Sequence, residues 1–135
     1  MVHLLLAGTT FPQATRSCHG EVVIHYAAGK PDRVELRSPN TWWPVEQDYM
    51  LDDYIFRLDP EQNAAAGVEW RVDLLSGRAR KLDKVSHSPG GVIKGGSAFV
   101  VSIKVDPQRN LQAIELHTRL YGIVLAWMGL TLERA

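Results

Sequence analysis

The segment from Ser38 to Leu58, SPNTWWPVEQDYMLDDYIFRL, concentrates the residues of this sequence that are best suited to binding. Flat aromatic rings stack on sugar faces, and nearby carboxylates and amides hydrogen bond to hydroxyl groups. The candidate contacts to a saccharide or to a neighbouring domain are Trp42, Trp43, Glu46, Gln47, Asp48, Tyr49, Asp52 and Asp53. The same rings also suit a buried core or an interdomain interface, and Pro44 is typical of a rigid, packed corner.

The carboxylates of this segment allow other chemistry. Paired carboxylates serve as acid and base in glycosidases, and acidic loops bind calcium. Asp52 and Asp53 are neighbours, however, so an extended chain sends them to opposite sides, and the spacing does not match an EF-hand loop. These carboxylates could instead cap a short helix or accept hydrogen bonds from backbone amides of a long loop. We predict no metal site, and calcium binding by the loop stays an open question.

Other motifs in the chain give little support to catalysis. There is no GxSxG elbow, and Cys18 and His19 lie in RSCHG, which we expect to be an exposed polar turn. PGGVIKGGS is not a phosphate loop, because Lys94 is followed by two glycines and a predicted strand. The five histidines show no HxH or HExxH spacing, and we expect His25 and His117 to face solvent. We therefore predict no catalytic residue and no cofactor.

The length and net charge of the chain limit the classes of protein to which it can belong. The chain of 135 residues has the length of one ordinary domain, and we expect a single domain over residues 1–135. Fifteen basic residues balance fifteen acidic ones, so no net charge attracts nucleic acid or an anionic membrane. The N-terminal run MVHLLLAGTTF is too short in apolar residues for a signal peptide or membrane span, and it predicts a strand. We expect a periplasmic or extracellular location if a longer parent chain carries a signal peptide.

Period-two alternation recurs along the chain and predicts two hairpins. In GEVVIHYA one face carries Val22, Ile24 and Tyr26 and the other Glu21, Val23 and His25. In RVELR, Val34 and Leu36 alternate with Arg33, Glu35 and Arg37, and AAGKPD between the runs has turn chemistry. In VEWRVDLLSGRARKL, Val68, Trp70, Val72 and Leu74 share a face opposite Glu69, Arg71 and Asp73, and Ser76-Gly77 supplies the turn.

The last forty residues predict further strands. In SAFVVSIKVD the inward residues are Phe99, Val101, Ile103 and Val105, and the outward ones are Ser102, Lys104 and Asp106. The stretch RNLQAIELHTRLYGIVLAWMGLTLER fits either a helix or two strands, and we favour strands because Gly122 would break a long helix. Its alternation sets Ile114, Leu116, Thr118 and Leu120 against Glu115, His117 and Arg119, then Val124, Ala126, Met128, Leu130 and Leu132 against Gly129, Thr131 and Glu133.

Seven or eight short strands separated by turn signals predict an all-β fold, an antiparallel β-sandwich of jelly-roll or galactose-binding type. The exception is residues 38–67, a long irregular connection that has room for a short helix. Long connections in compact domains are usually functional or interfacial.

The string NTWWPVEQDYMLDDYIF (residues 40–56) resembles a segment, approximately N-x-x-WWPIEQDY-x-x-DDYAF, of large bacterial glycoside-hydrolase-like proteins in a domain-of-unknown-function family. RVDLLSGRARKLD and LQAIELHTRLYGIVLAWMGLTL are similar to that family's following hairpin and closing pair of strands. In the family, a six-hairpin (α/α) glycosidase-type domain is joined to β-sandwich domains. The insert PEQNAAAG (residues 60–67) departs from the pattern, because it is longer than the family leads us to expect.

The resemblance implies that this chain is a β-sandwich cut from a larger parent and is not itself an enzyme. We expect a non-catalytic accessory domain of a carbohydrate-active protein, one that braces the catalytic domain of the same parent chain or contacts carbohydrate. Two alternatives stay open. The chain could be a purely structural interdomain module with no ligand, or its acidic loop could lend a carboxylate to a neighbouring glycosidase active site.

Overall fold

The computed structural model describes residues 1–9, 17–37, 41–42, 44–48, 66–81 and 91–134, with the backbone alone for 47–48, 66–69 and 91–92. These residues form strands and no helix, which confirms the predicted all-β class. The strands are β1 (Val2–Thr9), β2 (Cys18–Tyr26), β3 (Asp32–Arg37), β4 (Gln47–Asp48), β5 (Ala66–Asp73), β6 (Ala79–Lys81), β7 (Gly91–Val92), β8 (Ser97–Ile103), β9 (Leu111–Thr118) and β10 (Val124–Leu132).

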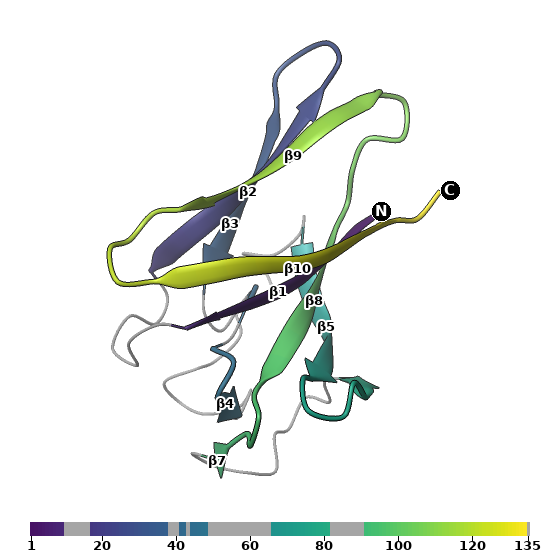
Figure 1. The fold of residues 1–135 in the computed structure, drawn as a ribbon. Helices are drawn as coiled ribbons and strands as arrows, with labels where there is room; N and C mark the ends of the chain where they lie inside the picture. The colour runs from purple at the N-terminus through teal and green to yellow at the C-terminus, as the bar shows by residue number, and fades with distance from the viewer. Residues whose placement is uncertain (10–16, 38–40, 43, 49–65, 82–90, 135) are drawn as a thin grey trace.

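Two antiparallel sheets pack against each other as the predicted β-sandwich (Figure 1). Sheet A has five strands in the order β10-β1-β8-β5-β6, and sheet B has three in the order β3-β2-β9. A short third sheet pairs β4 with β7. Both predicted hairpins, β2–β3 and β5–β6, are confirmed, and so is the pair of C-terminal strands.

The core lies between the sheets, and it follows the predicted alternation in β2, β3 and β8 and a similar alternation in β1. Burial of these apolar side chains is the main stabilising contribution to a sandwich of this kind. The fully or nearly fully buried residues are Val2, Leu4 and Leu6 of β1, Val22 and Ile24 of β2, Val34 and Leu36 of β3, and Phe99, Val101 and Ile103 of β8.

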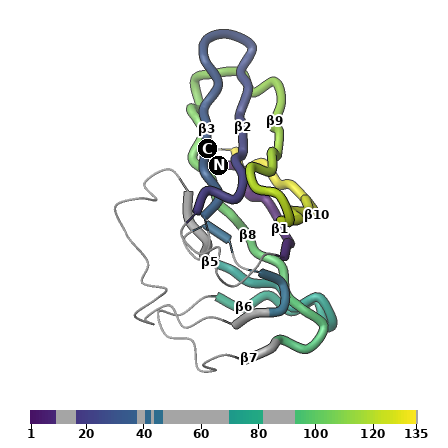
Figure 2. Tube along the Cα trace, turned by 90° about the vertical axis from the view of Figure 1, so that its left-hand side faces the viewer, coloured from purple at the N-terminus to yellow at the C-terminus, as the bar shows by residue number. Residues whose placement is uncertain are grey.

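The β2–β3 hairpin and β9 project beyond the end of sheet A (Figure 2). Tyr26 holds this projection to the β8–β9 connection, because its hydroxyl donates to Asp32 Oδ2 at 2.7 Å and accepts from the Asp106 amide at 3.3 Å. The Arg109 guanidinium lies 3.6 Å from the centre of the Tyr26 ring. Burial, and then the hydrogen bond to Asp32, raises the pKa of Tyr26.

The predicted two-face pattern of β5 is wrong at its centre. The register shifts between Val68 and Trp70, so that Arg71 lies opposite the core residue Phe99. Arg71 is completely buried, and Trp70 is 40% exposed. A β-bulge inserts an extra residue and so reverses the alternation that follows it.

A second shift corrects the predicted faces of β10. Leu5 lies opposite Gly129, but Leu6 lies opposite Trp127, so Met128 is the additional residue. Leu130 and Leu132, opposite the buried Leu4 and Val2, therefore do not alternate in phase with Val124 and Ala126 as predicted.

The prediction of an exposed turn at Cys18 and His19 is also wrong. Both residues open β2, where Cys18 is half-buried and His19 is completely buried. The His19 carbonyl accepts a hydrogen bond from the Arg119 amide at 2.8 Å, which continues the pairing of β2 with β9.

Candidate functional site

Trp42, the first aromatic residue of the candidate site, is a core residue. Its side chain has no exposed surface, and its ring meets the His19 imidazole edge to face with centroids 5.2 Å apart. Gly8 makes room for the ring, because a Cβ at that position would lie 3.0 Å from Trp42 Cζ3. Trp42 Nε1 has no hydrogen-bond partner among the residues that the structure describes. The ring is therefore not available for stacking on a saccharide in this structure.

The chain that follows Trp42 is tied to the ends of sheet A. The Val45 amide donates to the Gly8 carbonyl at 2.8 Å, and the Val45 carbonyl accepts from the Ser97 amide at 2.7 Å. The buried Arg71 side chain donates to the Pro44 carbonyl at 3.3 Å and to Ser97 Oγ, with its guanidinium 4.8 Å from the centre of the Phe99 ring. These contacts explain why an arginine is buried here and why the segment is fixed at this point.

Three of the polar candidates lie within the described residues. Glu46 is half-buried, and its Oε1 accepts a hydrogen bond from Thr9 Oγ1 at 3.4 Å. Gln47 and Asp48 form β4, with backbone pairing to Val92 and Gly91. The other predicted site residues, Trp43, Tyr49, Asp52 and Asp53, lie outside the described residues, as does most of the long connection from 38 to 67.

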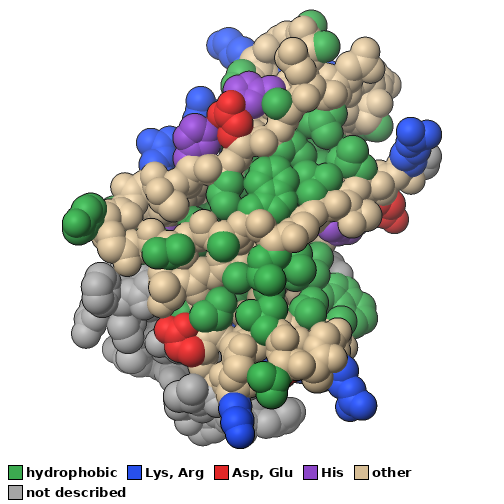
Figure 3. Space-filling model, in the orientation of Figure 1, with side chains coloured by type: hydrophobic (Ala, Val, Ile, Leu, Met, Phe, Trp, Pro, Cys, Tyr) green, Lys and Arg blue, Asp and Glu red, His purple; other side chains and the backbone are tan. Residues whose placement is uncertain are grey.

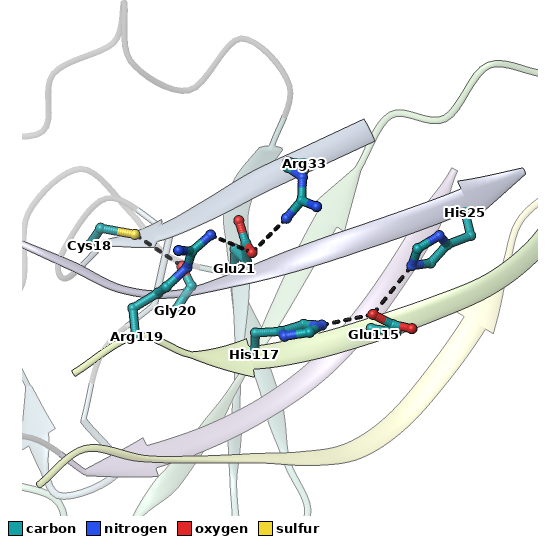
Figure 4. A network of polar contacts seen from close by, with 8 residues as sticks. All are labelled: Cys18, Gly20, Glu21, His25, Arg33, Glu115, His117 and Arg119. Carbon is teal, nitrogen blue, oxygen red and sulfur yellow. Dashed lines mark hydrogen bonds and ion pairs between the residues drawn. The ribbon is translucent and has the colours of Figure 1, made fainter. Parts of the chain in front are cut away.

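The outer face of sheet B is charged, and Glu21 of β2 is its most enclosed group. Its Oε1 accepts hydrogen bonds from Arg33 Nη1 of β3 at 2.7 Å and from Arg119 Nη2 after β9 at 2.5 Å (Figure 4). The hydrogen bond from Arg119 is the main reason that the pKa of Glu21 is lowered. This contact links the three strands of the sheet.

Glu115 of β9 lies beside two histidines on the same face. Its Oε2 is 2.8 Å from His117 Nε2 and 3.3 Å from His25 Nε2 (Figure 4). The hydrogen bond with His117, followed by that with His25, lowers the pKa of Glu115. Within the described ranges, no group of three or more His, Cys, Asp and Glu side chains is placed to hold a metal ion.

The outer face of sheet A carries exposed apolar side chains instead. Leu5 of β1 lies opposite Val100 of β8, and Val100 lies opposite Trp70 of β5. Leu5 and Val100 are half-buried, and Trp70 is exposed. At the β10 end Gly129 leaves space, because among the described residues a Cβ there would meet only Leu5 Cβ, at 3.8 Å. We call Leu5, Val100 and Trp70 the apolar row.

The neighbouring strand β10 is also apolar and exposed. Figure 3 shows hydrophobic side chains gathered on the face that β10 crosses. No residue from Leu120 to Leu132 is charged. The exposed side chains of the strand, between 38% and 59% accessible, are Val124, Trp127, Met128, Leu130 and Leu132.

Sequence reasoning did not find the apolar row, because the bulge in β5 decides that Trp70 faces outward. The uncharged run before Glu133 was a usable signal for the surface of β10, since an end strand normally carries charges.

Comparison with protein-family models, with curated protein sequences and with solved structures finds no match to this chain. No helix in the part of the chain that the structure describes is long and apolar enough to cross a membrane.

Proposed function

We propose that this chain is a non-catalytic accessory β-sandwich that braces a neighbouring domain of a carbohydrate-active protein. It does so through the apolar row of sheet A, and Trp42 serves the core. The apolar row, in which Trp70 is exposed and Leu5 and Val100 are half-buried, is the observation that carries the proposal. Contiguous exposed apolar surface with a polar surround is typical of a protein interface.

The polar surround is present on the same face. The next row toward the start of β1 holds His3 and Ser102, with His3 Nδ1 2.9 Å from Ser102 Oγ, and His3 Nε2 lies 3.2 Å from Glu133 Oε2. On the far side of Trp70, Lys81 of β6 lies opposite. An apolar centre with a polar border matches the composition of interdomain contacts.

The carbohydrate-active class of the neighbour is supported by the resemblance of residues 40–56 to glycoside-hydrolase-like proteins. The complete burial of Trp42 favours the bracing role over direct stacking on sugar. The acidic residues Asp52 and Asp53 lie outside the described residues, and no role is assigned to them.

Oxidative side-chain labelling tests this proposal. The chain alone and its full natural reading frame would be exposed to hydroxyl radicals, and modification of each tryptophan, tyrosine and methionine would be measured by mass spectrometry. We expect Trp70 to be modified at least about threefold less in the longer protein, because interface residues lose their solvent contact. Tyr121, at the fully exposed turn before β10, is the internal control and should be modified equally in both. Equal modification of Trp70 in the two proteins would rule out the apolar row as the bracing surface.

A further inference from the structure

Strand β10 ends sheet A, and in the described residues it pairs with β1 alone. An end strand presents unpaired backbone N–H and C=O groups, to which another strand can add. β10 has nine residues, whereas β6, at the opposite end of the same sheet, has three. The longer edge therefore offers much more backbone for pairing.

The charges on the sheet edges set β10 apart. Proteins commonly protect an end strand by making it short or by placing charged side chains on it. β6 carries Arg80 and Lys81, and four of the six residues in β3 (DRVELR) are charged. β9 carries Glu115 and His117, but none of the nine residues in β10 is charged. Among the edges of the two large sheets, β10 alone lacks charge protection in the described structure.

The exposed apolar surface lies along the same edge. Leu130 and Leu132 are opposite Leu4 and Val2, which are completely buried, yet they are 39% and 53% exposed. Sheet B has two strands fewer than sheet A, so the side of β10 that should face a core is left uncovered. A partner at this edge would satisfy backbone groups and cover apolar side chains together.

We propose that β10 pairs antiparallel with β10 of a second copy of this chain, about a two-fold axis. The absence of charge on β10 is the reason for choosing a second copy of the chain as its partner. In such a symmetric contact residue i of one copy pairs with residue j of the other and j pairs with i, so a run of like charges on the strand would face itself, and β10 has no such run. A charged strand would lose hydration against this surface without meeting an opposite charge. The pairing joins two five-stranded sheets edge to edge and leaves the apolar row of each copy accessible, so it is independent of the proposed bracing function.

One feature of β10 works against pairing, namely the bulge at Met128. Bulges bend an end strand and are one way in which proteins prevent it from pairing with another strand. This bulge lies near the middle of the strand, so regular backbone stays available on both sides of it, up to Val124 and Leu132.

Sedimentation equilibrium of the chain from about 1 μM to about 1 mM tests the pairing, because dimers form by mass action. We expect a mass of twice the 15.1 kDa of one chain at the upper end of this range. Met128→Lys should raise the dissociation constant at least about tenfold, because two lysines would be brought together near the axis. Leu75→Lys is the matched control, since Leu75 is 72% exposed in the β5–β6 turn, and it should leave the constant unchanged.

A second measurement does not depend on any variant. Amide hydrogen exchange within residues 124–132 of the native chain should slow as the concentration rises through the dissociation constant, while exchange in β6 and β3 should not. Because the interface is uncharged, the constant should change less than about twofold between low and high salt. A monomer at every concentration would overturn the proposal, as would assemblies larger than a dimer. A dimer that Leu75→Lys disrupts and Met128→Lys spares would overturn it too.

Discussion

Trp42 lies in the core between His19 and Gly8, although its residue type and its neighbours suit sugar stacking. Tryptophan carries a large apolar surface, so burying its ring in an apolar core is favourable wherever the fold offers such a site. The identity of the residue was therefore compatible with both uses, and burial or interdomain packing was the favoured one. Only the contact with β1 and β2 separates them, and that contact depends on residues more than twenty positions away.

Replacing Trp42 with alanine should remove one of the largest core side chains. We expect Trp42→Ala to lower the free energy of unfolding by about 3 to 5 kcal/mol, as large-to-small core substitutions do. Trp70→Ala is the matched control, and it should cost no more than about 1 kcal/mol because Trp70 is exposed. Urea unfolding followed by circular dichroism measures both, and equal losses would contradict the assignment of Trp42 to the core.

Glu21 should give the stability a pH dependence of known sign. The hydrogen bond from Arg119 lowers the pKa of Glu21 in the folded chain. The contribution of Glu21 to the free energy of unfolding is therefore present above the pKa of a glutamate in the unfolded chain, about 4.3, and it is lost as the pH falls through the pKa of Glu21 in the folded chain. We expect the free energy of unfolding to fall more steeply below about pH 5 in the native chain than in Glu21→Gln. Urea titrations at several pH values would refute this if the two slopes were the same.

At the scale of the strands, alternation predicted most of the sandwich. The predicted inward residues of β2, β3 and β8 lie in the core, although the pairing of β2 shifts register between Cys18 and Gly20 and between His25 and Tyr26. The errors fall where the register shifts, at Val68 and Trp70 in β5 and at Met128 in β10. The position of a bulge depends on how two strands pair, so it cannot be predicted from the alternation within one strand.

The predicted candidate site was recovered less well than the fold. Alternation is repeated many times along a strand, whereas a site depends on which single side chains meet. Trp42 and Glu46 are only four residues apart, yet one lies in the core and the other near Thr9 at the surface. The apolar row gave no local signal, because its three residues come from β1, β5 and β8 and meet only through sheet pairing.

The close approach of β1 and β10 at Gly8 gives a further prediction. A Cβ at Gly8 would lie 2.5 Å from the Val124 carbonyl oxygen, and backbone cannot move aside as a side chain can. Gly8→Ala should therefore lower the free energy of unfolding by about 1 to 3 kcal/mol. In the described part of the chain, the added Cβ of Gly129→Ala in the partner strand would meet only Leu5 Cβ, at 3.8 Å, so this substitution should cost less than about 0.5 kcal/mol. Thermal unfolding compares the pair, and a costlier Gly129→Ala would contradict the described packing.

At the scale of the whole molecule, the two sheets present different surfaces. Sheet B shows ion pairs centred on Glu21 and Glu115, and sheet A shows the apolar row and β10. The unequal widths of the sheets, three strands against five, leave β10 uncovered. The charged outer face of sheet B and the apolar row of sheet A therefore differ in character, and the proposed bracing uses sheet A.

A dye that fluoresces on apolar surfaces should detect this asymmetry. We expect Trp70→Ser to reduce dye binding by the folded chain by at least about twofold, because it removes the largest exposed side chain of the apolar row. Arg33→Ser, on the outer face of sheet B, is the control and should leave dye binding unchanged. Greater loss in the control than in Trp70→Ser would place the apolar surface elsewhere.

The most direct measurement of whether the Trp42 region belongs to the core or to a sugar site is the NMR signal of the Trp42 indole N–H. The chain would be labelled with nitrogen-15, and oligosaccharides of several classes would be added. Because the side chain is completely buried, we expect slow exchange of this proton with solvent and no shift of its resonance on addition of sugar. Rapid exchange, or a saturable shift with any oligosaccharide, would contradict the core assignment and return the function to the segment around Trp42.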